Sequence, residues 1–355
     1  MTIPTEPIGS IPRPRHLIDA VVRSHGDIDA PELDPIFEDA IRDTITRFEA
    51  TGSPVITDGE QRKYIGAWDS CVHGLPNVVP DGFKVPCTAG LMQRMPRLIE
   101  APFRYAHHAD HDLEVAKRYA RAPLKQTVIS PCALSLLYPV DGIAGYSREQ
   151  FIDDLLAEHV GEVRRCLQKG AHSVQVDFTE GRLAIELDPT GTLLASFLVL
   201  TNLALARFST EERKQLGVHN CSGRGPSSPH RTDLYCGVLL PSVLQLDLTN
   251  FYVSLADETD RKRVLRVLRD NLKPGQRLFV GVVSALDPRI ETPEEVCARV
   301  LEAAEYIPVE QLGTTDDCGF SPSTDDASTT RDITFAKIAA RVRGTELAAR
   351  TLRAS

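Results

Sequence analysis

The stretch Ser147-REQFIDDLLAEHVGEVRRCLQ-Lys169 is followed, after a short turn, by Ser173-Val-Gln-Val-Asp177. The first part has apolar residues at helical spacing, and the second is a short β-branched run. A helix followed by such a strand is the repeating unit of α/β folds with a parallel sheet.

The same alternation runs along almost the whole chain and predicts eight strands. We expect them at residues 6–10, 54–58, 127–130, 173–177, 216–219, 244–248, 278–283 and 312–316. Helices are expected at 31–50, 147–169, 292–305 (with Thr292 as its cap) and 330–349. Eight strands favour a closed (β/α)₈ TIM barrel over a doubly wound sheet, and the G-x-G-x-x-G turn of the latter is absent from the sequence.

Residues 1–355 are predicted to form this single barrel, because no linker or internal repeat divides the chain. Residues 62–125 are too long for a simple crossover and are rich in glycine and proline. We expect them to form an insertion over the barrel mouth. Trp68, His73, His107 and His108 in this insertion either line a substrate pocket or anchor the insertion.

Composition excludes several classes of protein. The net charge is -9 and the pI is about 5.6, so no surface for nucleic acid is expected; the basic run at 261–269 has the spacing of a solvated helix face. No run of apolar residues is long enough for a membrane span or a secretory leader, which favours a cytoplasmic protein. The 8 cysteines are therefore interpreted as buried thiols and metal ligands.

Functional residues of a barrel come from the carboxyl ends of its strands. His219 and Cys221 lie two residues apart at one such end, so their side chains leave the backbone on the same side. Cys318 follows the last strand and opens onto the same mouth. Imidazole and thiolate ligands suit zinc, and a catalytic zinc has three protein ligands and one open position. The spacing therefore predicts a zinc site.

Five motifs carry a family resemblance: Ile8-Gly-Ser-Ile-Pro12, Asp58-Gly-Glu-Gln61, Val174-Gln-Val-Asp177, Val218-His-Asn-Cys221 and Asp316-Asp-Cys-Gly-Phe320. In this order they resemble the C-terminal catalytic barrel of cobalamin-independent methionine synthases. The resemblance extends from about Ile8 to the C-terminal helix.

The resemblance implies an enzyme that binds Zn²⁺ through His219, Cys221 and Cys318 and transfers a methyl group to homocysteine or a related thiol. In such enzymes the thiol takes the open position on zinc and reacts as a thiolate. Glu60 and Asp177 would hold the amino group of homocysteine, and Ser10 would lie near its carboxylate. The partners are then a small-molecule thiol and an alkyl donor, with the oligomeric state left open.

Other polar residues near strand ends extend the candidate site. Glu180 joins Asp177 and Glu60 as a catalytic candidate, and Arg62 and Asn250 are candidates for binding substrate. Asp58 and Asp316 are expected to act mainly as caps. The family's glutamate ligand after strand six is absent. Either Asp247 or Gln245 replaces it as the fourth ligand, or the fourth position stays open.

Two alternatives remain open. A lone barrel with these ligands is also similar to the zinc enzymes that add coenzyme M to epoxides, for which Arg13, Arg62, Arg182 and Arg224 are candidate sulfonate partners. The second alternative is a non-catalytic barrel whose zinc is structural, with Asp247 or Cys236 completing a tetrahedron.

Overall fold

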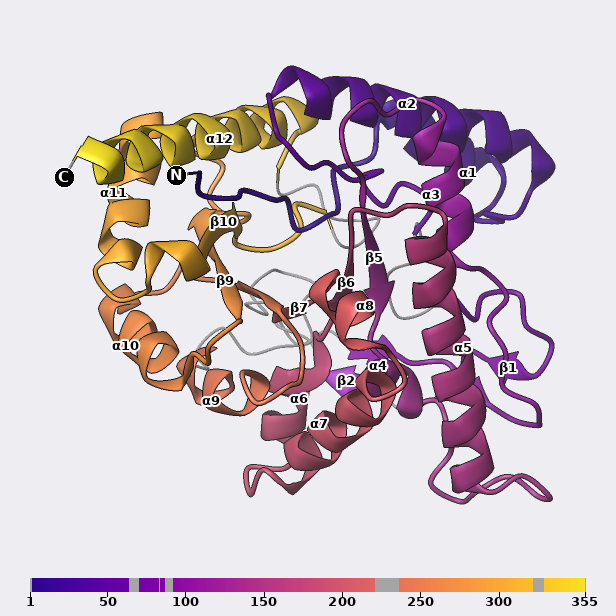
Figure 1. The fold of residues 1–355 in the computed structure, drawn as a ribbon. Coiled ribbons are helices and arrows are strands. Elements are labelled where there is room, and N and C mark those ends of the chain that lie inside the picture. Colours follow the sequence, from indigo (N-terminus) through magenta and orange to yellow (C-terminus); the bar gives the residue numbers. More distant parts are fainter. Residues whose placement is uncertain are drawn as a thin grey trace.

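The computed structural model describes residues 2–63, 70–82, 84–86, 92–220, 236–321 and 329–354. Its main sheet has six parallel strands in the order β10-β9-β8-β7-β6-β5 (Figure 1). They are β5 (Lys125–Ile129), β6 (Ser173–Asp177), β7 (Leu216–Asn220), β8 (Asn250–Val253), β9 (Arg277–Val283) and β10 (Leu312–Asp316).

Helices surround this sheet on its outer side (Figure 1). The longer ones are α1 (Arg15–Arg23), α2 (Asp34–Ala50), α3 (Ala109–Lys117), α5 (Arg148–Gln168), α6 (Glu180–Leu187), α7 (Thr192–Leu205), α10 (Arg261–Asn271), α11 (Pro293–Ala304) and α12 (Arg331–Ala354). The shorter ones are η1 (Pro31–Leu33), α4 (Pro131–Ser135), α8 (Thr210–Lys214), η3 (Cys236–Val238), α9 (Leu240–Val243) and η4 (Val309–Gln311). No helix in the described ranges combines the length and the apolar character that a membrane span requires.

Two extended segments connect the outer strands of this sheet. Thr5 forms a parallel bridge with Thr314 of β10, and Ile56 forms one with Leu124, directly before β5. The segments also bond to each other, because the amide of Ile11 donates to the carbonyl of Gly59 at 3.0 Å. They lie where strands were predicted at 6–10 and 54–58, but each forms only a single bridge rather than a strand. The α/β barrel fold class is confirmed.

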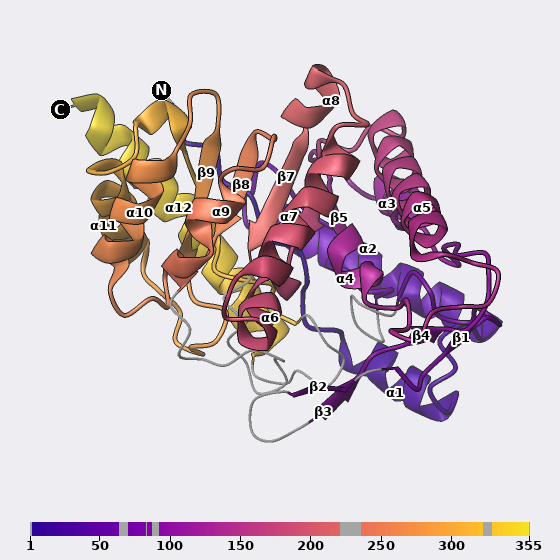
Figure 2. The same cartoon turned by 90° about the horizontal axis from the view of Figure 1, so that it is seen from below.

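The segment predicted as an insertion contains two small antiparallel pairs and helix α3. β1 (Val78–Val79) pairs with β4 (Arg97–Leu98), and β2 (Lys84–Pro86) pairs with β3 (Met92–Arg94). Figure 2 shows these strands near the end of the barrel opposite α8 and the two termini. Helix α3 packs against α2, α5 and β5, so it occupies the position of the crossover helix into β5.

One predicted strand is wrong. Residues 244–248 form turns after α9, where the amides of Gln245 and Leu246 donate to Ser242 and Val243. The true strand is β8, which begins at Asn250 and pairs with β7. The alternating Leu-Gln-Leu-Asp-Leu sequence resembles a half-buried strand, but these leucines close the end of a short helix.

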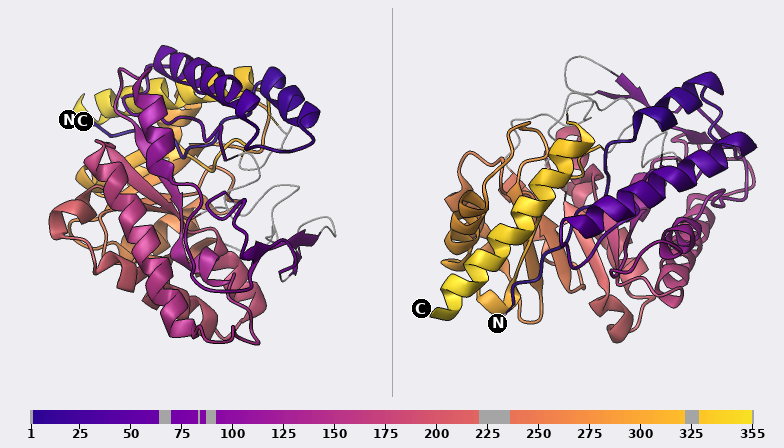
Figure 3. Two further views of the ribbon diagram at one scale, coloured as in Figure 1. Left: turned by 90° about the vertical axis from the view of Figure 1, so that its right-hand side faces the viewer. Right: turned by 90° about the horizontal axis from the view of Figure 1, so that it is seen from above.

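The predicted helices are confirmed as η1 with α2, α5, α11 and α12. Ser147 and Thr292 each form a capping box at the start of α5 and α11, so the local sequence defines these ends. Helix α12 packs along β9 and β10, and the N-terminal segment bonds to Thr314. The two termini consequently lie side by side (Figure 3).

The barrel interior contains a group of buried polar residues, which we call the floor cluster: Glu6, Lys125, Gln175 and Tyr252. The ammonium of Lys125 lies 2.8 Å from Gln175 Oε1, 3.8 Å from Glu6 Oε2 and 3.9 Å from the centre of the Tyr252 ring. The Tyr252 hydroxyl donates to Glu6 at 2.5 Å. These residues come from the N-terminal segment, β5, β6 and β8, so they meet across the barrel.

Candidate active site

Two of the predicted zinc ligands meet at the mouth. His219 is the next-to-last residue of β7, and Cys318 follows β10 by two residues. His219 Nε2 and Cys318 Sγ are 3.8 Å apart. Two such ligands on one tetrahedral zinc should be about 3.6 Å apart, given Zn–N and Zn–S bonds of about 2.05 and 2.3 Å. This pair therefore fits a zinc ion.

The third predicted ligand, Cys221, lies outside the described residues. Within the described ranges no group of three His, Cys, Asp or Glu side chains has the arrangement of a metal site. The described part of the predicted centre is thus the pair of His219 and Cys318. The side chains of Trp68, Arg224 and Cys236 also fall outside the described part of the chain.

Ser10 anchors the loop that carries Cys318. Its hydroxyl accepts the amide of Ser321 at 3.3 Å, and its carbonyl accepts the amide of Phe320 at 3.0 Å. A Cβ on Gly319 would lie only 2.2 Å from Ser10 Oγ, so this close approach requires glycine. Ser10 therefore lies at the mouth as predicted and also determines the path of the Cys318 loop.

Glu60 stands in a tight loop after the second barrel segment. Its φ is +55°, and its amide donates to Asp58 Oδ1 at 2.9 Å, so Asp58 stabilises the turn rather than capping a helix. A Cβ on Gly9 would lie 2.2 Å from Glu60 Oε1, which means that this carboxylate presses directly against the first segment. The Glu60 side chain is consequently held in one place at the mouth.

Lys63 was not predicted as a site residue. Its ammonium lies 3.2 Å from Glu60 Oε2 and donates to the Thr127 hydroxyl at 2.6 Å and the Thr127 carbonyl at 3.0 Å. Although burial lowers the pKa of Lys63, the charges of Glu60 and Asp177 raise it above its usual value. The three-residue spacing from Glu60 was the available sequence signal.

Asp177 ends β6 and pairs in register with His219 of β7. Gln175 donates to Asp177 Oδ1 at 2.7 Å. Burial and the charge of Glu60 raise the pKa of Asp177 to about 6, while His219 and Lys63 act in the opposite direction. The structure thus brings Asp177, Glu60, Lys63 and His219 into one electrostatic group.

Two candidate arginines have structural partners. Arg13 is buried and donates to the carbonyls of Glu60 at 2.9 Å and Lys63 at 2.6 Å, so it stabilises their loop. Arg62 pairs with Asp34 at 2.9 Å and lies 3.9 Å from Asp112, between α2 and the start of α3. The structure therefore places Arg62 with Asp34 and Asp112, and its role in binding substrate stays a prediction.

Glu180 also has a structural role. Its carboxyl is 0% exposed and accepts a hydrogen bond from the Ser130 hydroxyl, which itself caps α4. Burial raises the pKa of Glu180 to about 7. The structure thus places Glu180 in a buried hydrogen bond with Ser130, and its catalytic role stays a prediction.

Asp247 and Asn250 lie at the wrong end of the barrel for their predicted roles. Asp247 pairs with Arg213 at 2.8 Å, and Asn250 donates to the carbonyls of Lys214 and Leu216 at the start of β7. The error follows from the misplaced strand, because both residues come before or at the start of β8. Asp247 is therefore not a fourth ligand, and Asn250 does not bind substrate at the mouth.

Ser254 follows the carboxyl end of β8, and Asp317, which follows β10, binds the same loop. The Ser254 hydroxyl donates to the carbonyl of Asp317 at 2.5 Å, and Asp317 accepts the amides of Leu255 and Ala256 at 2.6 Å each. Asp316 pairs with Arg341 at 3.2 Å. The sequence analysis did not identify Asp317 or Ser254, which connect the loops beside both described ligands.

Comparison with known proteins agrees with this geometry. A family model described as "Cobalamin-independent synthase, Catalytic domain" matches residues 3–341. The chain belongs to this family. Over 97% of its length it is 23% identical to a methionine synthase of Sulfurisphaera tokodaii, covering 92% of that protein. It is 24% identical to the uncharacterised protein YxjH of Bacillus subtilis, with 89% of this chain and 86% of that protein covered.

Solved structures of family members share the fold. A B12-independent methionine synthase from Shewanella sp. W3-18-1, in complex with selenomethionine, matches with a TM-score of 0.75 at 18% identity and 100% coverage of both chains. A putative vitamin-B12 independent methionine synthase from Listeria monocytogenes matches with a TM-score of 0.69 at 20% identity and 98% coverage of both. At these identities the similarity establishes the barrel fold alone.

Proposed function

We propose that this protein is a zinc-dependent S-alkyltransferase that methylates homocysteine or a closely related amino-acid thiol. Membership of the cobalamin-independent synthase family and the methionine synthases among its relatives support this reaction. The mouth of the barrel supports an acceptor that carries an amino group.

The observation that supports the proposal is that the described part of the mouth has two carboxylates but one lysine to pair with them. Glu60 and Asp177 interact electrostatically, and Lys63 is the described cation that pairs with Glu60. Both carboxyl groups are largely buried, where an uncompensated negative charge is costly. An incoming ammonium group would balance the second carboxylate. The amino group of homocysteine provides that charge.

The metal site would combine His219 and Cys318 with Cys221. A zinc ion held by these side chains would lower the pKa of a bound thiol, so that the thiol reacts as a thiolate. The 3.8 Å separation of the two described donor atoms supports this set of ligands.

The remaining residues position the acceptor. Glu60 and Asp177 would accept hydrogen bonds from its ammonium group, and Lys63 would keep the Glu60 carboxylate in place. Once the thiol has lost its proton, its sulfur forms a bond to the methyl carbon as the carbon's bond to the donor breaks. The leaving group departs with that electron pair.

The coenzyme M alternative receives less support. A sulfonate requires an uncommitted cation, whereas Arg13 and Arg62 already bind backbone carbonyls and carboxylates. Arg182 is buried and lies 4.0 Å from Glu258. The described arginines therefore favour an ammonium over a sulfonate as the group that the mouth recognises.

Calorimetric titration of the zinc-loaded protein with three thiols tests the proposal. Homocysteine is compared with 4-mercaptobutanoate, which lacks only the amino group, and with coenzyme M. We expect homocysteine to bind about tenfold or more tightly than the other two, the size of one charged hydrogen bond. Tighter binding of coenzyme M would favour epoxide opening, and no thiol binding at all would contradict the proposal.

A further inference from the structure

Arg13 is a buried residue at the rim of the mouth, between the first barrel segment and α1, and it is 6% exposed. Its guanidinium donates to four backbone carbonyls: Glu60 at 2.9 Å, Gln61 at 3.3 Å, Lys63 at 2.6 Å and Ser321 at 3.5 Å. The first three belong to the loop that carries Glu60, and the fourth belongs to the loop that carries Cys318. One side chain therefore joins the loop of the proposed ammonium-binding acid to the loop of a zinc ligand.

Glu60 needs support because its backbone is strained. Its φ is +55°, in the left-handed region that residues with a side chain rarely adopt. Asp58 accepts the Glu60 amide at 2.9 Å, and Arg13 donates to the Glu60 carbonyl at 2.9 Å. That carbonyl also accepts the amide of Lys63 at 3.1 Å, which closes the turn. A strained conformation persists only where surrounding contacts determine it, and Arg13 provides one of these contacts.

The direction of the Glu60 carboxylate follows from this backbone conformation, because the backbone determines which side-chain rotamers are allowed. Glu60 Oε2 lies 3.2 Å from the ammonium of Lys63. Arg13 donates to the carbonyls of both residues, so it fixes the backbone from which each side chain extends. Rotation of Glu60 out of the left-handed region would redirect its carboxylate without changing its charge.

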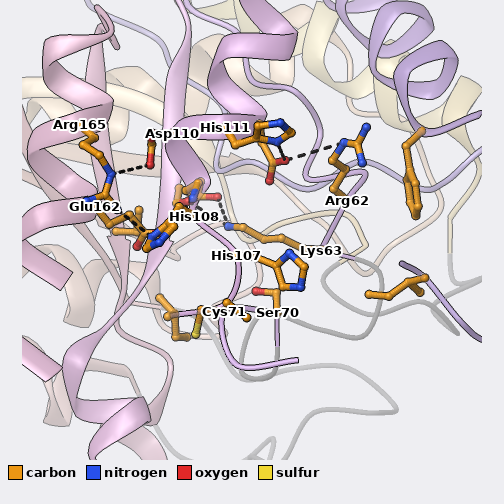
Figure 4. A pocket seen from close by; sticks show the side chains of 18 of the residues that line it. Arg62, Lys63, Ser70, Cys71, His107, His108, Asp110, His111, Glu162 and Arg165 are labelled. Carbon is orange, nitrogen blue, oxygen red and sulfur yellow. Dashed lines mark hydrogen bonds and ion pairs between the residues drawn. The ribbon is translucent and has the colours of Figure 1, made fainter. Parts of the chain in front are cut away.

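A cavity adjoins this part of the mouth. Its volume is about 630 Å³, which suits a small-molecule ligand, and Lys63 and Thr127 line it. Figure 4 shows Lys63 beside this cavity, together with His107 and His108 from the insertion. The position of the two histidines agrees with the interpretation that they line a pocket. Because Lys63 belongs to both, the Glu60–Lys63 pair lies where the cavity meets the mouth.

The shape of arginine suits the role of Arg13 better than that of lysine. Nε and both Nη atoms of the planar guanidinium donate here, in directions that are fixed relative to one another. A lysine ammonium would keep the positive charge, but it presents its donors from a single atom and would reach fewer of the four carbonyls.

We propose that Arg13 is a positioning residue for recognition of the acceptor's amino group. It holds Glu60 in the left-handed conformation in which the carboxylate meets the ammonium, and it acts through Glu60 without touching the substrate. The inference rests on the proposed function, since it concerns the same amino-group site.

Arg13→Lys tests the inference, because it keeps the charge and removes the planar set of donors. Calorimetry of the zinc-loaded protein gives the ratio of the affinities for homocysteine and 4-mercaptobutanoate, which differ only in the amino group. This ratio should fall about tenfold, while the affinity for 4-mercaptobutanoate stays unchanged. A loss of stability alone would lower the number of binding sites per chain and not the ratio. The same ratio in the variant and in the unaltered protein would overturn the inference.

Two further variants sharpen the result. Arg15→Lys changes an exposed residue that pairs with Asp19 at 2.9 Å, so it is the matched control and should keep the ratio of the unaltered protein. In Glu60→Gln the ratio should already be low, and adding Arg13→Lys should lower it no further, because Arg13 acts through Glu60. A second tenfold fall in the double variant would show that Arg13 acts by another route, and the inference would be wrong.

Failure of the proposed function would give a different result. A ratio near one in the unaltered protein would contradict amino-group recognition itself and this inference with it. A high ratio that survives in Arg13→Lys would overturn only the role of Arg13. If Arg13→Lys is destabilised, trimethylamine N-oxide, which favours the folded state, is added to every titration.

Discussion

The floor cluster and the mouth of the barrel both contain buried ionised groups, but their charges balance differently. In the floor, Glu6 faces Lys125, and nearby Asp316 faces Arg341, so each acid has its own cation. At the mouth, Glu60 and Asp177 share Lys63. Among the described residues, the mouth therefore has two carboxylates for one lysine.

The pKa values of Glu6 and Asp177 differ in the same way. Burial raises the pKa of Glu6, but the hydrogen bond from His172, the charge of Lys125 and the Tyr252 hydroxyl together bring it below its usual value. At the mouth, burial and Glu60 raise the pKa of Asp177 to about 6. Both carboxyl groups are buried, yet the pKa of Glu6 is lowered by its partners and the pKa of Asp177 is raised. A cationic ligand at the mouth would stabilise the ionised form of Asp177.

The largest effect is expected from the metal ligands of the mouth. Cys318→Ala or Cys221→Ala should remove most bound zinc and lower methyl transfer by about three orders of magnitude or more, because a three-ligand site loses a thiolate. Zinc content by mass spectrometry and turnover with homocysteine measure this. Cys297→Ala, on outer helix α11, is the control and should retain both. Full activity in either ligand variant would contradict the mechanism.

Substitution of a residue in the floor cluster should change the stability of the protein rather than its activity. Lys125→Met leaves Glu6 without its cation and should lower the free energy of unfolding by about 3 kcal/mol, as for other broken buried pairs. Urea unfolding measures this, and activity per folded molecule should be unchanged. The double variant Glu6→Gln with Lys125→Met should recover part of the loss. If the double variant lost as much unfolding free energy as the two single variants together, or more, the pairing of Glu6 with Lys125 would be contradicted.

The amino-group site should give a smaller and selective effect. Asp177→Asn removes one acceptor of the ammonium and should raise the KM for homocysteine about 10- to 100-fold, the range of a charged hydrogen bond. The affinities for 4-mercaptobutanoate and coenzyme M should change little. Equal losses for all three thiols would show that Asp177 does not recognise the amino group.

Substitutions at the end of the barrel opposite the mouth should have little effect on stability or zinc content. Asp247→Asn removes an exposed ion pair with Arg213, so stability should change by less than about 1 kcal/mol and zinc content should not change. Thermal unfolding and metal analysis check this. Loss of zinc in this variant would restore Asp247 as a fourth ligand and would contradict the register of β8.

The barrel could be predicted from sequence because its strands and helix ends have local signals. The β-branched run at 173–177 and the capping residues Ser147 and Thr292 each act within a few residues of themselves. The strand predicted at 244–248 failed for the same reason, since local alternation cannot distinguish a strand from a short helix end. That single error placed Asp247 and Asn250 at the mouth.

The candidate site could be predicted in part. Four of the predicted residues lie at or just after the carboxyl ends of barrel segments, where barrel function is expected: His219, Cys318, Glu60 and Asp177. Lys63 pairs with Glu60 three residues away, and that spacing was a usable signal. The role of Arg13 depends on carbonyls that lie about 50 residues away, and such contacts leave no local pattern. Glu180 has the right position in sequence, but the packing of α4 and α6 buries it.

Zinc X-ray absorption, with and without homocysteine, tests the central claim most directly. The resting protein should have one nitrogen and two sulfur ligands from His219, Cys221 and Cys318. Homocysteine should add one further sulfur at about 2.3 Å, and 4-mercaptobutanoate at the same concentration should add less. An unchanged spectrum with homocysteine would contradict the proposal that this mouth activates an amino-acid thiol.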